Sequence, residues 1–91
     1  MDPAITHDPQ RHRFETTVEG HEAHVEYLLA GGFMTITHTW VPEAIGGRGI
    51  AGALARAALD HARAEGLKVR PHCPYADAWM RKHPDYEDLR A

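Results

Sequence analysis

Residues 46–52 form the segment whose composition and spacing are most typical of a binding site. They read Gly-Gly-Arg-Gly-Ile-Ala-Gly and lie between an alternating apolar stretch and a stretch with helical spacing. Glycine allows the backbone to approach a ligand closely, and the N–H groups at the start of a helix attract phosphate oxygens. The segment therefore predicts a phosphate-binding loop. The alternative is a turn whose glycines only let the helix pack closely on a sheet.

The spacing Gly47-x-Gly49-x-x-Gly52 also matches the pattern of dinucleotide-binding loops. A dinucleotide-binding domain begins with a parallel βαβ unit and needs more strands than 91 residues can supply. Here the pattern before the loop predicts hairpins instead. No lysine followed by serine or threonine completes a nucleotide-triphosphate loop. A nucleotide-binding protein that uses the glycine loop remains an alternative.

Cys73 is the one cysteine of the chain and a candidate nucleophile. Pro74 suits the first position of a helix, which makes Cys73 the N-cap residue. The positive end of a helix, together with Arg70 and His72 nearby in the sequence, is expected to lower the pKa of the thiol. The resulting thiolate could accept an acyl group. The alternative is a small buried apolar side chain.

Two further side chains are candidates for proton transfer. His38 alternates with Met34, Ile36 and Trp40, which predicts an imidazole on the apolar face of a strand. There it would act as a base or form a hydrogen bond within the core. Tyr75 follows Cys73 by two residues and is a candidate acid, with packing in the core as the alternative.

Alternating apolar residues predict the strands that would position these groups. Residues 1–10 show no period, and we expect a flexible arm there. Three alternating stretches follow, separated by Gly20 and by Gly31-Gly32, and they predict an antiparallel meander over residues 14–18, 23–29 and 33–41.

The spacing then becomes helical over residues 49–65, and Gly66 is placed to end that helix. Residues 67–70 predict a short further strand, and a second helix begins at Pro74 and ends before Pro84. The expected apolar stripe of the first helix is Ile50, Leu54, Ala57, Ala58 and Ala62. The side chains expected to face solvent are Arg56, Asp60 and Arg63. The expected buried residues of the second helix are Tyr75, Ala78 and Trp79.

The composition limits what the chain can do. Its 91 residues allow one domain, which we place at residues 11–91, without a separate substrate domain. A net charge of −3 argues against a nucleic-acid partner, and no apolar run is long enough to cross a membrane. A single cysteine and the lack of an apolar N-terminal segment favour a cytoplasmic location. The eight histidines show no paired ligand spacing, so we expect no metal site.

Several segments in a specific order resemble the small single-domain GCN5-related N-acetyltransferases, from about Arg13 to the end of the chain. The segments are Thr37-His38-Thr39-Trp40-Val41-Pro42-Glu43, Gly47-Arg48-Gly49-Ile50-Ala51-Gly52-Ala53-Leu54, Pro71-His72-Cys73-Pro74-Tyr75 and His83-Pro84-Asp85-Tyr86-Glu87-Asp88-Leu89. The resemblance implies a minimal α/β fold of the α+β kind. Such a fold has a twisted, mostly antiparallel sheet with two helices packed on it.

The resemblance also implies acetyl-CoA as the donor, with its pyrophosphate over the glycine loop, and an amine as the acceptor. Cys73 would lie beside the thioester, where its strand splays from the strand at residues 33–41. The implied catalytic residues are Cys73, His38 and Tyr75, and Tyr75 would return a proton to the thiolate of CoA. The implied cofactor-binding residues are Val41, Gly46, Gly47, Arg48, Gly49, Ile50, Ala51 and Gly52.

Two positions depart from the family pattern. Gly46 replaces a long polar residue, for which Arg48 could compensate, and Trp40 replaces an acidic residue that relatives often carry before Val-Pro. Direct transfer to the amine and transfer through an acetylated Cys73 both stay open. A non-catalytic acyl-CoA-binding or partner-binding module is the main alternative to an enzyme. The acceptor would be a protein or a small molecule, and the protein a monomer or a homodimer.

Overall fold

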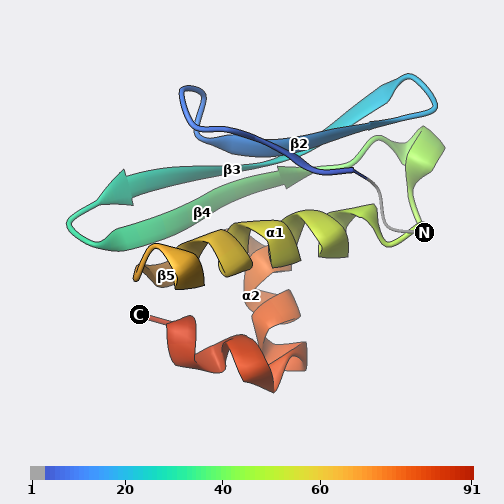
Figure 1. Cartoon of the computed structure of the whole chain (residues 1–91). Helices are drawn as coiled ribbons and strands as arrows, with labels where there is room; N and C mark the ends of the chain where they lie inside the picture. The colour runs from blue at the N-terminus through green and yellow to red at the C-terminus, as the bar shows by residue number, and fades with distance from the viewer. Residues whose placement is uncertain (1–3) are drawn as a thin grey trace.

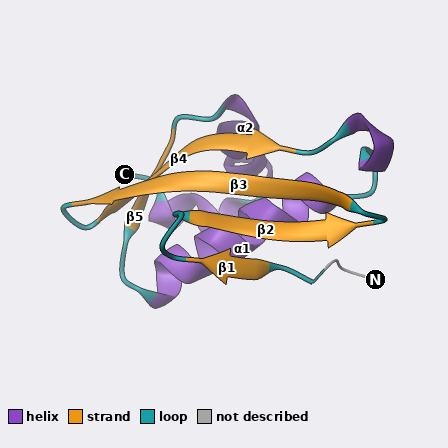
Figure 2. Ribbon diagram, turned by 90° about the horizontal axis from the view of Figure 1, so that it is seen from above, coloured by secondary structure: helices purple, strands orange, loops and turns teal. Residues whose placement is uncertain are grey.

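Both α-helices lie on one face of a five-stranded sheet (Figure 1 and Figure 2). The computed structural model describes residues 4–91. The strands are β1 (Thr6–Asp8), β2 (Arg13–Val18), β3 (His21–Ala30), β4 (Phe33–Trp40) and β5 (Lys68–Pro71). The helices are α1 (Ile50–Ala64) and α2 (Pro74–Lys82), and the short 3₁₀ helices are η1 (Glu43–Ile45) and η2 (Pro84–Leu89).

The strands lie in chain order across the sheet, from β1 at one edge to β5 at the other. Neighbouring strands are antiparallel, except that β5 runs parallel to β4. The connection between β4 and β5 contains α1, as a parallel crossover requires. The structure therefore confirms the predicted mostly antiparallel sheet with two helices packed on it.

A register shift in β4 moves His38 to the face of the sheet that the helices do not cover. Ile36 pairs with Tyr27 and His38 pairs with Glu26, so Thr37 has no partner on β3. Such a bulge reverses the alternation of the side chains beyond it. Ile36 is fully buried, whereas His38 is exposed. The prediction of an apolar setting for His38, on the same face as Ile36, is therefore wrong.

The prediction of a flexible arm over residues 1–10 is wrong for β1, while residues 1–3 lie outside the described part of the chain. Thr6–Asp8 pair with β2 and form one edge of the sheet. The ring of His7 stacks on Phe14 with a centroid distance of 4.1 Å, and its Nε2 shares a 2.5 Å hydrogen bond with the hydroxyl of Tyr27. Three residues are too few for alternation to show, and these contacts come from distant parts of the chain.

Helix α1 packs on the sheet through a buried face that consists half of alanines and half of Ile and Leu. Gly66 adopts a φ of +70° directly after the helix, and Leu67 N–H donates to the carbonyl of Ala62 at 2.8 Å, as in a Schellman motif. This confirms the predicted role of Gly66. The buried residues are Ile50, Leu54, Ala55, Ala58, Leu59 and Ala62, so the predicted stripe missed Ala55 and Leu59 and included the half-buried Ala57.

Helix α2 begins at Pro74 with Cys73 as its N-cap and ends before Pro84, as predicted. Its buried residues are Ala76, Trp79 and Met80. The prediction that Tyr75 and Ala78 would be buried is wrong, because the buried face of this short helix is turned by about one residue. Neither α1 nor α2, nor any other helix in residues 4–91, has the length and apolar character that crossing a membrane requires.

The charged residues of α1, Arg56, Asp60 and Arg63, are exposed as predicted, and they also contact η2 at its edge. Tyr86 is 6% exposed and donates a 2.7 Å hydrogen bond from its hydroxyl to Asp60 Oδ1. Arg63 forms two hydrogen bonds to the carboxylate of Asp88, at 2.9 and 3.0 Å. These contacts fasten η2 to α1. Because η2 begins only two residues after the end of α2, they also hold α2 in place.

The contacts of His7 predict that the docking of β1 depends on pH. Burial, and the nearby ring of His61, lower the pKa of His7 below its usual 6.5. The unfolded chain therefore binds more protons, and stability falls as the pH drops through about 6.5 toward the lower folded pKa. We expect the free energy of unfolding of His7→Gln to depend less on pH between 7.5 and 5.5, as measured by urea denaturation. His72→Gln, at an exposed histidine, is the control and keeps the wild-type dependence; equal slopes for all three proteins would contradict the prediction.

Candidate functional site

The glycine loop places unbonded backbone N–H groups at the start of α1. Gly47 and Gly49 have φ values of +75° and +76°, and Gly49 is the N-cap of the helix. The first helical hydrogen bond runs from Ala53 N–H to the carbonyl of Gly49, at 3.0 Å. The N–H groups before Ala53 therefore point out of the helix end. A Cβ atom at Gly47 or Gly49 would meet nothing within 4 Å, so the surface of the loop is open to a ligand.

A cavity of about 280 Å³ lies over this loop. It is lined by Val41, Ile45, Gly46, Gly47, Gly49, Ile50, Ala51, Gly52 and Tyr75. Seven of the eight predicted cofactor-binding residues thus line one cavity. Arg48 does not, because its guanidinium forms an ion pair with Glu19 at the turn between β2 and β3. Both side chains of that pair are about half exposed, so Arg48 is free to exchange this partner for another anion.

Tyr75 extends from the first turn of α2 to the glycine loop. Its hydroxyl lies 3.5 Å from the position that a Cβ atom on Gly52 would occupy, and its side chain is 40% exposed. This exposure argues against core packing, the alternative that the sequence left open. Burial raises the pKa of the phenol above 10, so the hydroxyl keeps its proton at neutral pH and serves as a hydrogen-bond donor.

Cys73 lies at the point where β4 and β5 separate. Its N–H donates to the carbonyl of Ile36 at 3.0 Å, immediately after the last paired residues, Ile36 and Pro71. Beyond this bond, β5 ends and the chain enters α2, while β4 continues to Trp40 beside β3 alone. The two segments form a fork between β4 and the start of α2. The fork adjoins the cavity, since Val41 directly follows β4 and Tyr75 is in the first turn of α2.

The thiol of Cys73 is 7% exposed, and its Sγ lies 3.4 Å from Oγ1 of Thr39. Burial by itself raises the pKa of this thiol. Hydrogen bonds from the Thr39 hydroxyl and from backbone N–H groups at the start of α2, those of Ala76 and Tyr75, outweigh the burial and leave the pKa below 9.0. The predicted direction of the shift is confirmed. The expected help from Arg70 is not found, because its guanidinium lies over the ring of Phe33 at 3.9 Å.

The three predicted catalytic residues do not form one cluster. Tyr75 is at the glycine loop, Cys73 is in the fork, and His38 is on the opposite face of the sheet. The ring of His38 lies 6.0 Å from that of His24, which contacts Glu26 at 3.0 Å. In residues 4–91, no three histidine, cysteine or acidic side chains are grouped so that they could hold a metal ion.

Sequence reasoning missed two residues of the site, Thr39 and Ile45. Thr39 faces Cys73 only because the bulge at Thr37 turns it inward, and no local pattern marks that bulge. Ile45 is 1% exposed and lines the cavity from η1. An isolated apolar residue between Pro42 and the glycines was a signal that could have identified it.

A strand that ends in a glycine loop, a helix that starts from that loop and a fork beside it define the acetyltransferase class of α+β folds. A solved structure from Staphylococcus aureus, described as GCN5-like, shares this fold with a TM-score of 0.76 at 24% identity. The match covers 99% of the present chain and 89% of the other.

The sequence comparisons agree with the fold. The sequence model of the GCN5-related N-acetyltransferases matches residues 13–89, and the chain belongs to this family. Protein NATD1 of Mus musculus is 38% identical over 84 residues, which are 88% of this chain and 76% of that protein. Protein NATD1 of Xenopus tropicalis is 36% identical over 91 residues, which are 92% of this chain and 84% of that protein.

The thiol environment gives a direct prediction. Thr39→Val removes the hydroxyl that stabilises the thiolate of Cys73, so we expect the thiol pKa to rise. The rate of alkylation by iodoacetamide, measured against pH, should then reach its plateau at a higher pH. Thr35→Val makes the same change on the other face of β4 and should leave the profile unchanged. An unshifted profile in Thr39→Val would show that the hydroxyl has no such role.

Proposed function

We propose that the protein transfers an acetyl group from acetyl-CoA to an amine. The observation that carries this proposal is the open cavity over the glycine loop, in a chain of the GCN5-related N-acetyltransferase family. The loop presents backbone N–H groups and the positive end of a 15-residue helix toward one open surface. This arrangement favours a diphosphate, which offers many acceptor oxygens and a negative charge.

The residues of the site fit coenzyme A. The N–H groups of Ile50, Ala51 and Gly52 would hold the pyrophosphate, and Arg48 would contact it by leaving Glu19. Val41 and Ile45 supply apolar walls for an alkyl chain that runs toward the fork. When bound, acetyl-CoA supplies an activated acyl group and a thiolate leaving group. The protein's part is then mainly to bind and orient the reactants.

Two side chains are assigned roles at the reacting end. Tyr75 holds a proton on its hydroxyl at neutral pH and lies at the mouth of the fork, where it can donate that proton to a developing thiolate. Cys73 is more than nine-tenths buried and does not line the cavity. This buried position supports direct transfer of the acetyl group to the amine, with Cys73 as part of the wall of the fork. The setting of His38 supports no contact with the donor, since it faces away from the fork.

Donor binding is tested by filling the surface of the loop. Gly49→Ala places a methyl group where the ligand would approach, and we expect the dissociation constant for acetyl-CoA to rise about tenfold or more in calorimetric titration. Gly32→Ala, in the turn between β3 and β4 with a φ of +86°, causes the same kind of backbone strain and should not change binding. Saturable binding of NAD without binding of acetyl-CoA would instead support a nucleotide-binding protein.

The route of transfer is tested at Cys73. Direct transfer predicts that intact-mass measurement after incubation with acetyl-CoA finds no hydroxylamine-sensitive acetyl adduct. It also predicts that Cys73→Ala keeps CoA release within about tenfold of wild type, because only packing in the fork changes. Turnover would be measured with lysine-containing peptides and polyamines as acceptors. An adduct that disappears in Cys73→Ala, together with lost turnover, would establish the acetyl-cysteine route. Acetyl-CoA binding without turnover on any acceptor would favour a non-catalytic acyl-CoA-binding module.

A further inference from the structure

The face of the sheet without helices, which we call the open face, consists of the side chains of β2–β5 that alternate with the buried ones (Figure 2). Two large apolar side chains on it are exposed, Leu28 of β3 at 58% and Trp40 of β4 at 50%. Leu28 follows the buried Tyr27, and Trp40 lies beyond the bulge in β4, level with His24. A partner that covers the open face would therefore remove apolar surface from water.

One end of the open face carries an excess of negative charge. Arg13 lies within ion-pair distance of three carboxylates, those of Glu15, Glu22 and Glu26, at 3.7, 3.4 and 3.2 Å. One guanidinium does not neutralise three carboxylates. The side chain of Glu22 is 54% exposed, so part of this excess charge is accessible from the solvent.

The other end of the open face carries an arginine without a carboxylate partner. Arg70 of β5 follows the fully buried Val69, so it points away from the core. Its guanidinium lies 3.9 Å from the centroid of the Phe33 ring, and no carboxylate in residues 4–91 forms an ion pair with it. The two ends of the open face therefore carry opposite charges, and the positive charge of Arg70 is held flat against an aromatic ring.

The strand register gives the point halfway between these two charges. Arg70 lies level with Leu28 across β4, so Glu22 is about 20 Å from it along the strands and two strands away across the sheet. The midpoint therefore falls on β4, at the level of Val25, whose partner on β4 is Thr39. Thr39 itself points toward Cys73 on the covered side. Its two neighbours in β4, one of which is Trp40, point out of the open face.

We propose that the open face binds a second copy of this chain, about a two-fold axis that lies in the interface and crosses β4 at Thr39. Arg70 and Glu22 are equally far from this point, so each Arg70 lies over Glu22 of the other copy. Trp40 is next to the axis and meets Trp40 of the other copy. A two-fold interface has to be complementary to itself, and a face with opposite charges at its two ends meets this condition. A partner of uniform charge would match one end and be repelled by the other.

The size of the open face indicates how tightly two copies would bind. It is about 30 Å long along β3 and about 15 Å wide across β2–β5, which gives roughly 450 Å² for each copy. Stable interfaces bury about 800 Å² on each partner, and smaller ones belong to weak complexes. Tryptophan at the centre of an interface is the residue type that contributes most to binding. We therefore expect a dissociation constant on the order of tens of micromolar.

The test is sedimentation equilibrium of charge-reversed variants between about 5 and 500 µM, where wild type should change from monomer to dimer. Arg70→Glu alone brings two carboxylates together at each contact, and Glu22→Arg alone brings two guanidinium groups together. Each variant should dimerise about tenfold more weakly than wild type. An equimolar mixture of the two restores a carboxylate and a guanidinium at both contacts, so it should dimerise as tightly as wild type.

The controls change similar side chains outside the open face. Arg81→Glu reverses the charge of an α2 arginine whose side chain is 72% exposed, and it should dimerise like wild type. Trp40→Ala should weaken the dimer about tenfold. Leu29→Ala should not, because Leu29 is 46% exposed but lies level with the buried Met34, on the other face. Wild type that stays monomeric throughout, or a mixture that dimerises no more tightly than either variant alone, would overturn the proposal.

A second measurement locates the contact between the two copies. The ¹H–¹⁵N signal of the Trp40 indole should shift as the concentration of wild type rises, because this side chain moves from solvent into the interface. Trp79, on the helical side of the sheet and 7% exposed, is the internal control and should not shift. A shift of the Trp79 signal without one of Trp40 would place the contact on the helical side and overturn the proposal. Neither measurement uses acetyl-CoA, so both outcomes are independent of the proposed function.

Discussion

The site depends on the separation of β4 and β5, which pair as far as Ile36 and Pro71 and part beyond the hydrogen bond from Cys73 N–H to the carbonyl of Ile36. A parallel pair of strands would normally extend this ladder, but Pro71 has no N–H to donate and Pro74 starts a helix. The chain therefore leaves the sheet while β4 continues. That departure creates the fork, places the thiol of Cys73 at its base and sends Tyr75 toward the glycine loop.

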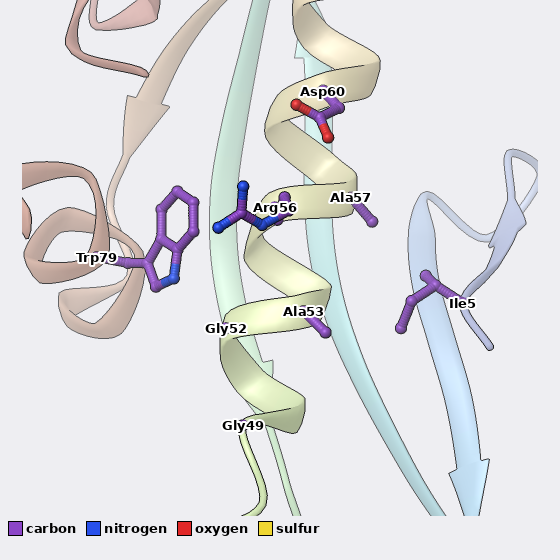
Figure 3. A pocket seen from close by; sticks show the side chains of 8 residues that line it. All are labelled: Ile5, Gly49, Gly52, Ala53, Arg56, Ala57, Asp60 and Trp79. Carbon is purple, nitrogen blue, oxygen red and sulfur yellow. The ribbon is translucent and has the colours of Figure 1, made fainter. Parts of the chain in front are cut away.

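The glycine loop and the small residues of α1 together determine where the surface of this helix is open. The inner side of α1 combines three alanines with Ile50, Leu54 and Leu59, and the short connection through η1 keeps its N-terminus near the end of β4. Gly52, Ala53 and Ala57 on the outer side leave an open cavity along the same helix (Figure 3). The helix thus packs against the core with Ala55, Ala58 and Ala62, and it lines the surface cavities with other small residues, among them Gly52 and Ala53. Its positive end provides the electrostatic preference for an anion.

The C-terminal segment stabilises the position of α2 in a chain with little core. Arg90 bonds to Asp77 of α2 at 2.7 Å and to Glu87 at 2.9 Å, and Tyr86 reaches across to Asp60 of α1. The ring of His83 stacks on Trp79 at 3.7 Å and its Nδ1 contacts the carbonyl of Trp79 at 2.7 Å. These contacts hold the ring of Trp79 against α1, where its indole Nε1 lies 3.3 Å from the position that a Cβ atom on Gly52 would occupy. A short segment that looks like a tail in the sequence therefore fixes the position of α2 and of Trp79.

Local pattern alone was sufficient for the three long strands, both helices, the cap at Gly66 and the glycine loop, because alternation, helical spacing and turn residues act over a few neighbours. The face on which His38 lies, the partner of the Cys73 thiol and the docking of β1 depended on tertiary structure. Thr37 has no partner on β3, and this bulge reverses which side chains of β4 face the core beyond it. A bulge depends on the pairing of two strands, which a local sequence pattern does not show. The sequence identified Cys73 and Tyr75 as candidate site residues. Their positions relative to each other depend on where β4 and β5 separate, which only the tertiary structure shows.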